Sequence, residues 1–591
     1  MHAEPVTISL AALPIDNLRA FKALSYTWGN PTTKHFILCE SKAIGVTCNL
    51  WSALRRLRHE TEERVLWIDA LCINQEDDAE RSSQVALMNR IYRDVQVLIW
   101  LGDEDTHTWE ALTLAHQLAK LADGEWNLHQ ATPSKQAHLD EMLSTHRLPP
   151  AKHPSWKYLE EILWNPWFFR AWIIQEIVFA KTLTIMIGSF SVPWQTFELA
   201  TEFIGNITQR QNQKIYIGTG LDIDTSPFTN LNELRASLLQ SRGASLENLL
   251  VLTNASRASL PVDKVYALQG LVPEADPVTI MPDYSSTVEQ VFMMVAQSLL
   301  HDSLDVLSQV GGPWLRQHTS LPTWVPDWST PFRAKPFLYC GVPRTSFRAC
   351  GNTTHNISFS SNGHKLGTKG ILIDKIKIVG SPFLANKKGN KTSFLNYATK
   401  PLDHLSPRHT LLHKLFFLGH FRKWETLVQS LRSYPTNEGV NSAFARTLIA
   451  DADISTENHS LSSTVNVEEV YNHFRYLQLK FIAEIYNIKM KWPKWDDAVV
   501  RATGRYITAL EEAAWGRALF ITERGYIGLG PLSTFKGDDV AVLYGAKTPY
   551  ILLSQGRESD GFHLLGETYI HGLMEGEAFQ ENLPAKVIEL V

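Results

Sequence analysis

A chain of 591 residues is too long for one hydrophobic core and predicts several domains. Its formal net charge of −5, with 44% hydrophobic and 20% charged residues, is typical of a globular protein and argues against nucleic-acid binding. No stretch approaches the roughly 20 apolar residues of a membrane-spanning helix, and five cysteines without C-x-x-C spacing suit reduced thiols, so we expect a cytoplasmic protein.

Three short apolar segments near the N-terminus predict neighbouring strands of a parallel sheet. They lie within residues 22–29, 65–75 and 95–103, and segments with the apolar spacing of helices lie between them. Ligands of such sheets bind outside the carboxyl ends of the strands, so we expect a site there. The polar and aromatic residues at those ends are Ser25, Tyr26, Trp28, Asp69, Asn74, Gln75 and Asp103.

Local signals predict smaller elements around these strands. Residues 35–40 and 43–47 alternate in polarity as a hairpin does, and Thr47 is suited to cap the helix that follows. Asp77 and Glu80 have the spacing of a capping box at the start of another helix.

An insertion, a helix and a further strand follow the third strand. Residues 122–154 are polar and interrupted by prolines, which predicts an insertion or mobile loop. Pro166 suits the first turn of a helix that we expect to run to Ala180. Residues 181–189 then predict a fourth strand, and residues 194–203 a helix.

The rest of the chain is helical first and becomes β towards its end. Residues 230–310 have a helical pattern, and the Pro-rich segment Leu321–Trp328 looks extended and pinned by its two tryptophans. Residues 345–379 alternate as β-strands do, and residues 452–466 are typical of a flexible loop. Residues 504–591 start helical and continue as strands separated by Gly-rich turns.

These elements predict three regions. The first, residues 1–205, is an α/β domain built on a parallel sheet with helices on both faces. A mainly helical middle region, residues 206–335, leads to an α+β region over residues 336–591 that ends in β-strands.

Glu176 is the first candidate for a catalytic residue. On a continuous helix from Pro166, it shares an apolar face with Trp172 and Ile173. A carboxylate in such a stripe is costly unless it is paired or faces a polar cavity. It is therefore either an acid facing the crevice or half of a buried ion pair with an arginine elsewhere; Arg170 lies on a different face of the predicted helix.

The other candidates also have two interpretations each. Asp69 is either a functional carboxylate or a cap for the loop that follows it. Asn74 and Gln75 either bind a ligand or hold the backbone of their own loop. Ser25 has no G-x-S-x-G around it, so it is better suited to a hydrogen bond than to nucleophilic attack. Trp28 either stacks on a ligand ring or packs in the core.

Metal binding is not expected. His409 and His413 have the i, i+4 spacing of zinc ligands, but Thr410 replaces the general-base glutamate and no third ligand is evident.

Several blocks together resemble the HET (heterokaryon incompatibility) domain of filamentous fungi. They are Ala23-Leu-Ser-Tyr-Thr-Trp-Gly29, Trp67-Ile-Asp-Ala-Leu-Cys-Ile-Asn-Gln75 and Pro166-Trp-Phe-Phe-Arg-Ala-Trp-Ile-Ile-Gln-Glu176, in that order. The resemblance continues downstream in residues 263–268, 282–284, 321–329 and 525–578.

The resemblance implies a role in non-self recognition and regulated cell death after fusion of unlike hyphae. It also implies a fold similar to the TIR domain, which is flavodoxin-like. Trp172-Ile-Ile-Gln-Glu176 is similar to the TIR signature W-C-x-x-E, with Ile173 in place of the cysteine. The glutamate of that signature is catalytic in TIR enzymes that cleave NAD.

Two functional hypotheses follow from the resemblance. In the first, NAD is the substrate, no cofactor is needed, Glu176 is catalytic, and Ser25, Tyr26, Trp28 and Asp69 shape the pocket. In the second, the domain is a non-catalytic signalling module. Its partners are then like domains, through self-association, or a nucleotide-binding receptor protein.

Overall fold

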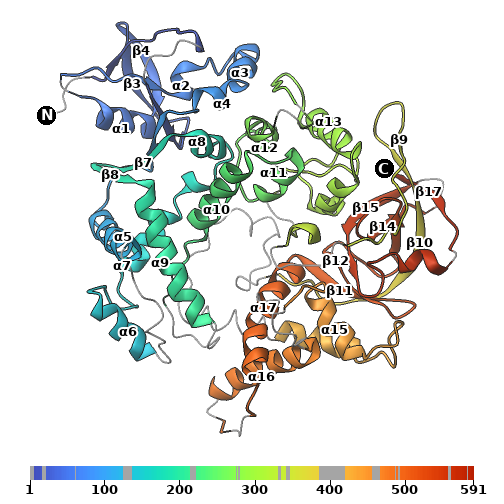
Figure 1. The fold of residues 1–591 in the computed structure, drawn as a ribbon. Coiled ribbons are helices and arrows are strands. Elements are labelled where there is room, and N and C mark those ends of the chain that lie inside the picture. Colours follow the sequence, from blue (N-terminus) through green and yellow to red (C-terminus); the bar gives the residue numbers. More distant parts are fainter. Residues whose placement is uncertain are drawn as a thin grey trace. The chain divides into compact units, whose positions relative to one another are not determined.

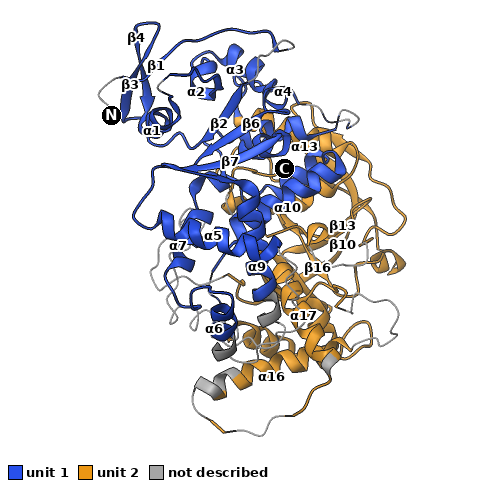
Figure 2. Ribbon diagram, turned by 60° about the vertical axis from the view of Figure 1, so that its left-hand side comes forward, with its two compact units in different colours: residues 1–287 blue, residues 288–591 orange. Residues whose placement is uncertain are grey.

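The computed structural model forms two compact units, residues 1–287 and residues 288–591 (Figure 2). It describes residues 5–15, 21–59, 61–123, 136–212, 221, 223–273, 276, 278, 280–330, 334–340, 347–384, 419–454, 466–485, 488–489, 493–556, 561–581 and 583–591. The predicted regions divide the chain more finely, and their boundaries stay a prediction. The predicted loop at 452–466 and the His409–His413 pair fall largely or wholly outside the described residues.

The first unit is built on a five-stranded sheet (Figure 1). Its order is β5 (Leu66–Trp67), β2 (Lys22–Tyr26), β6 (Gln96–Trp100), β7 (Thr182–Ile187) and β8 (Phe190–Pro193). The first four are parallel, as predicted, whereas β8 pairs with β7 in the antiparallel sense, so the sheet is mixed. Since β5 and β6 lie on opposite sides of β2, the winding reverses at β2, and ligands bind at such switch points. The TIR-like arrangement as a whole stays a prediction.

The predicted hairpin forms a second, smaller sheet. Strands β3 (Lys34–Cys39) and β4 (Lys42–Thr47) pair antiparallel, and β1 (Thr7–Ile8) adds to β3. Helix α1 (Cys48–Leu57) follows directly, and the side chain of Thr47 accepts a hydrogen bond from the backbone N–H of Leu50, as expected of an N-cap.

The other helices of the first unit lie between and after these strands. They are α2 (Asp69–Cys72), α3 (Asp78–Val85), α4 (Met88–Ile91), α5 (Thr108–Asp123), α6 (Gln136–Thr145), α7 (Ser155–Leu163), α8 (Ile173–Phe179), α9 (Trp194–Asn212), α10 (Ser226–Ser241), α11 (Leu246–Leu252) and α12 (Asp263–Tyr266), with the 3-10 turns η3 (Pro166–Phe169) and η4 (Gln269–Leu271). The predicted insertion at 122–154 is therefore not a loop throughout, because α6 lies inside it.

The predicted continuous helix from Pro166 to Ala180 is wrong. A short 3-10 turn, η3, ends at Phe169, and α8 begins only at Ile173. Between them Arg170 is extended and forms a parallel bridge with Arg257, in which the N–H of Ala171 donates to the carbonyl of Arg257 at 2.8 Å. This strand-like pairing with a distant segment replaces the helical hydrogen bonds, so the two halves do not share one helical face.

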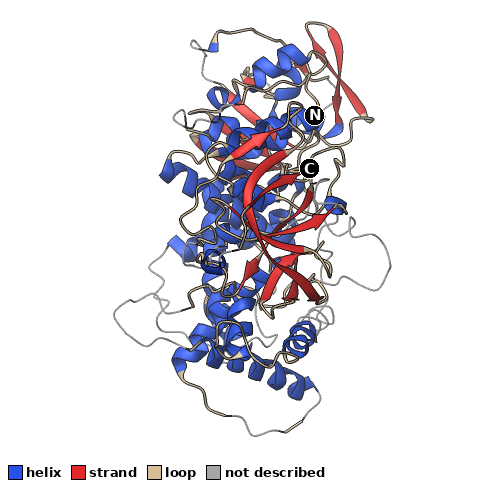
Figure 3. Ribbon diagram, turned by 90° about the vertical axis from the view of Figure 1, so that its right-hand side faces the viewer, coloured by secondary structure: helices blue, strands red, loops and turns tan. Residues whose placement is uncertain are grey.

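The second unit contains a nine-stranded sheet that closes on itself (Figure 3). The path β13–β14–β15–β17–β10 returns to its start because β10 also pairs with β13. Closure of this kind pairs each of these five strands on both sides, as in barrels. The strands are β9 (Ile357–Phe359), β10 (Leu366–Val379), β11 (Arg517–Thr522), β12 (Ile527–Pro531), β13 (Asp539–Leu543), β14 (Tyr550–Ser554), β15 (Phe562–Glu567), β16 (Tyr569–Ile570) and β17 (Lys586–Leu590). The strands predicted after residue 504 are thus confirmed.

The second unit also contains helices, several of which share a large apolar core with the sheet. They are α13 (Val288–Leu300), α15 (Val440–Leu448), α16 (Val467–Ile485) and α17 (Asp497–Ala514), with the 3-10 turns η5 (Asp305–Gln309), η6 (Pro313–Leu315), η7 (Phe337–Tyr339) and η10 (Glu577–Glu581). Side chains of α15 and α17, such as Phe444 and Leu510, share one buried cluster with Phe520 and Ile527 of the sheet. Among the described helices, none has both the length and the apolarity needed to cross a membrane.

Candidate functional site

The carboxyl ends of β2 and β5 bring several predicted site residues together. Ser25 and Tyr26 are the last residues of β2, and Asp69 lies two residues after the end of β5 and begins α2. The Tyr26 hydroxyl interacts with the Asp69 carboxyl, and the indole Nε1 of Trp28 donates to Asp69 Oδ2 at 2.8 Å. Glu176 of α8 interacts with the Ser25 hydroxyl. The structure therefore brings five predicted site residues together: Ser25, Tyr26, Trp28, Asp69 and Glu176.

Glu176 is buried at this cluster, with 3% of its surface exposed. Its carboxyl accepts a hydrogen bond from the Ser25 hydroxyl, and Ser25 Oγ in turn accepts one from Trp167 Nε1 at 2.7 Å. The other oxygen, Oε2, is buried without a hydrogen-bond partner among the described residues. Burial raises the pKa of Glu176 to about 7, against the opposing effects of Arg170 and Ser25.

Arg170 is the cation next to these carboxylates, contrary to the expectation from helical spacing. The break at Arg170 lets its guanidinium Nη1 donate to the carbonyl of Tyr26 at the end of β2. The positive charge lowers the pKa of both Glu176 and Asp69, although burial outweighs it at each. The sequence left two interpretations of Glu176: an acid that faces the crevice, or a partner of a buried arginine. In the structure Glu176 lies at the strand ends, as in the first, and next to an arginine, as in the second.

Asp69 and Trp28 form a link between two strand ends. Asp69 Oδ1 accepts from the N–H of Ala70 at 2.7 Å, which is the capping role considered for it, while Oδ2 accepts from Trp28. Burial raises the pKa of Asp69. Trp28 is 38% exposed, so it is not a core residue.

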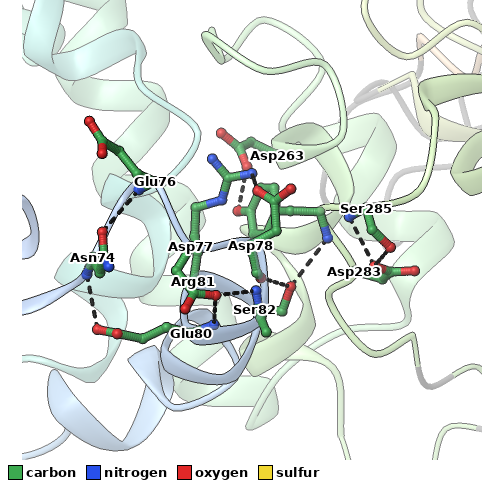
Figure 4. Close-up of polar contacts among 12 residues, drawn as sticks. Asn74, Glu76, Asp77, Asp78, Glu80, Arg81, Ser82, Asp263, Asp283 and Ser285 are labelled. Atoms are coloured by element: carbon green, nitrogen blue, oxygen red, sulfur yellow. Dashed lines mark hydrogen bonds and ion pairs between the residues drawn. The ribbon is translucent and has the colours of Figure 1, made fainter.

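Asn74 and Gln75 hold their own loop, as Figure 4 shows for Asn74. The N–H of Asn74 donates to Glu80 Oε1 at 3.0 Å, and its side-chain oxygen accepts from the N–H of Glu76 at 3.2 Å. Gln75 Nε2 donates to the carbonyl of Asp69 at 3.3 Å. Asp77 caps α3 as predicted, but Glu80 reaches Asn74 rather than completing a capping box with Asp77.

Residues far downstream hold the helix that carries Glu176. Tyr284 donates its hydroxyl hydrogen to Asp263 Oδ1 at 2.8 Å, and the Arg81 guanidinium lies 3.9 Å from the centre of the Tyr284 ring. Asp263 also accepts a hydrogen bond from the side chain of Trp172, the residue that precedes α8. Sequence reasoning missed this network, although residues 263–268 and 282–284 were part of the resemblance.

A small cavity lies at the carboxyl end of β6. Its volume is about 140 Å³, and its lining includes Asp103, Asp105, His107 and Tyr158. The rings of His107 and Tyr158 are stacked with centroids 4.0 Å apart. Glu176 does not line this cavity, and sites for drug-sized ligands are usually about 300–1,000 Å³. This cavity is therefore too small for a dinucleotide.

Comparisons with known proteins define the class of this protein. Residues 21–176 match the family described as heterokaryon incompatibility protein (HET), and residues 449–583 match the Het-6 beta-barrel domain. Matches to a HET domain and, further along the chain, to a Het-6 barrel domain confirm the resemblance to the HET family that the motifs predict. A similar protein is "Heterokaryon incompatibility protein 6, OR allele" of Neurospora crassa, 26% identical over 95% of this chain and 90% of that protein. No solved structure matches the chain.

Proposed function

We propose that this protein acts in fungal non-self recognition and triggers regulated cell death when unlike hyphae fuse. The observation that carries the proposal is the similarity along 95% of the chain to a heterokaryon incompatibility protein, with the HET and Het-6 barrel domains both matched. A match to an isolated domain would support only a shared fold.

A heterokaryon assay tests this proposal. The full chain is expressed in a fungal strain from which its gene has been deleted, and that strain is fused with strains of like and unlike genotype at the locus. Death of the unlike fusions with survival of the like fusions is the expected result. Equal survival of all fusions, with the protein verified by immunoblot, would contradict it.

The geometry of the resting chain favours a signalling module over an enzyme poised for reaction. The Glu176 carboxyl is buried beside a guanidinium, and its nearest strand ends are tied by the Trp28–Asp69 and Arg170–Tyr26 hydrogen bonds. In this proposal the domain acts in the cytoplasm through self-association or through a nucleotide-binding receptor.

NAD cleavage is a second candidate, favoured by the unpartnered oxygen of Glu176 at the end of β2. A carboxylate there would accept hydrogen bonds from the ribose hydroxyls and stabilise positive charge on the ribose as nicotinamide leaves, as carboxylates do in glycosidases. Self-association would have to open the strand ends first.

Nicotinamide release from NAD, with and without induced oligomerisation, tests this second candidate. Glu176→Gln is compared with Glu202→Gln, which changes an exposed acid on α9. Activity that is lost only in Glu176→Gln supports NAD cleavage. Absence of release from the oligomerised wild-type chain, or cell killing that persists in Glu176→Gln, excludes it as the cause of death.

A further inference from the structure

The second unit contains a large cavity that the proposed function does not use. Its volume is about 820 Å³, within the range of sites for small organic ligands. Its lining comes from η6, the Pro-rich segment that contains Leu321–Thr323, the turn between β9 and β10, and His563 of β15.

The walls of this cavity are tied to one another by hydrogen bonds. The indole Nε1 of Trp324 donates to the carbonyl of His364 at 3.0 Å, which joins the Pro-rich segment to the β9–β10 turn. Thr323 Oγ1 accepts from the N–H of Leu564 at 2.9 Å, which joins the same segment to β15. Within the turn, the N–H of Lys365 donates to Ser360 Oγ at 3.0 Å. A cavity with walls held in this way is preformed, which lowers the cost of binding.

Two cationic side chains, Arg316 and Lys365, line the cavity together with the imidazoles of His364 and His563 and with Val591. Among the described residues, the lining includes no aspartate or glutamate. Burial and the nearby Arg316 lower the pKa of His563, so this ring adds no positive charge near neutral pH. The guanidinium of Arg316 donates only to neutral backbone carbonyls, at 2.5–3.0 Å, from Leu321, Pro322, Thr323 and Val325.

Arg316 carries a buried charge that the described residues do not neutralise by an ion pair. Its Nε is buried without a hydrogen-bond partner among them. The carboxylate of Asp327 acts on it from a distance, but one oxygen accepts from the N–H groups of Gln317 and His318 at 2.8 and 3.0 Å. Burial lowers the pKa of Arg316 to about 10, which reflects the cost of this charge. An anion in the cavity would offset that cost.

An exposed aromatic side chain lies at the same cavity. Trp314 lines it and is 55% exposed, and its ring lies 5.9 Å from that of Phe535, which is also 55% exposed. Such an indole is suited to stack on a planar ring. The hydroxyl and amide groups of Thr319, Ser320, Ser361 and Asn362 also line the cavity and can donate to and accept from hydroxyl groups of a ligand.

We propose that this cavity binds a phosphorylated nucleoside. The phosphate would lie near Arg316 and Lys365, the base would stack on Trp314, and the ribose would contact the hydroxyl-bearing residues of the lining. Lys365 reaches Glu589 at 3.2 Å in a half-exposed ion pair, so its ammonium can turn to a ligand at little cost.

Calorimetric titration of the full chain with ADP tests this proposal, with adenosine and inorganic phosphate as separate arms. Binding of ADP with at least tenfold weaker binding of adenosine and of phosphate is expected, since each supplies only part of the recognition. Trp314→Ala and Lys365→Ala should each weaken ADP binding about tenfold, the usual effect of losing one stacked ring or one charged contact.

Two matched variants control for nonspecific effects. Trp109→Ala removes an exposed tryptophan of the first unit, and Lys369→Ala removes an exposed lysine of β10 outside the cavity lining. Both should bind ADP as the wild type does. Circular dichroism of all four variants verifies that they are folded.

Three results would overturn the proposal. The first is the absence of heat with ADP up to millimolar concentration. The second is wild-type affinity in both Trp314→Ala and Lys365→Ala, which would place any bound ADP elsewhere. The third is binding of adenosine or of phosphate alone as tight as that of ADP.

Discussion

The indole of Trp28 and the carboxylate of Asp69 join two strand ends through a 2.8 Å hydrogen bond. Trp28 follows β2, and Asp69 follows β5, so the bond closes the edge of the sheet at which the winding reverses. The same carboxylate interacts with the Tyr26 hydroxyl, and the positive charge of Arg170 lowers its pKa. Trp28, Asp69, Tyr26 and Arg170 therefore form one cluster around the end of β2.

Trp28→Phe should destabilise this edge. The variant keeps an aromatic ring but removes the donor to Asp69, and a hydrogen bond to a charged group is worth about 1.5–3 kcal/mol. We expect a loss of about 1–2 kcal/mol in the free energy of unfolding, because Trp28 is partly exposed. Urea denaturation measures it, with Trp109→Phe as a control that should change nothing. An unaltered urea midpoint in Trp28→Phe would show that the bond contributes no stability.

The stability of the first unit should depend on pH through Glu176. The pKa of this carboxyl is raised from 4.5 to about 7 in the folded chain, so the folded state holds the proton more tightly than the unfolded state. Its stabilising contribution is complete below pH 4.5 and is lost as the pH rises towards and through about 7. The loss is up to about 3 kcal/mol for a shift of this size.

Glu176→Gln isolates this effect from other acids that titrate in the same range. The variant should lack the loss of stability that the wild type shows as the pH rises. Between about pH 5 and pH 8 the variant should therefore become more stable relative to the wild type. Urea denaturation at each pH measures the difference. A difference that is constant with pH would mean that Glu176 does not titrate there.

Arg170→Met should destabilise the chain more at high pH than at low pH. It removes the cation next to Glu176 and Asp69 and the donor to the Tyr26 carbonyl. Because Arg170 is half-buried, we expect a loss below the about 3–5 kcal/mol that is typical of breaking a fully buried ion pair from one side. In Arg170→Met/Glu176→Gln, part of this cost should be recovered because one unpaired acid is gone. Strict additivity of the two substitutions in a double-mutant cycle would indicate that they do not interact.

In the second unit, the buried ion pair of Arg517 and Glu567 should be essential to the closed sheet. The two side chains are 2% and 4% exposed, with Nη2 and Oε1 2.9 Å apart, and the guanidinium lies 3.6 Å from the centre of the Phe337 ring. Arg517→Met alone should cost about 3–5 kcal/mol, since it leaves a buried carboxylate. Thermal unfolding of the wild type and of Arg517→Met measures this loss. The control is Arg524→Met, which removes the exposed Arg524–Glu581 pair and should lower the free energy of unfolding by under about 1 kcal/mol.

Much of the local structure could be predicted from the sequence. The strands β2, β5, β6 and β7, the hairpin of β3 and β4 and the Thr47 cap all follow from neighbouring residues. Strand alternation, capping and turn chemistry are properties of a few consecutive residues, so they are visible in the chain before it folds. The motifs that identify the HET domain are local in the same sense.

The environment of Glu176 was decided by the tertiary structure alone. The chain leaves the helical path at Arg170 because Arg257 pairs with it there, and Asp263 and Tyr284 then hold the start of α8. None of these contacts leaves a periodic signal near Glu176. The sequence by itself therefore determined which residues gather at the end of β2, whereas only folding decided that the acid is buried beside an arginine, because segments distant in sequence supply the hydrogen bonds that break the helix.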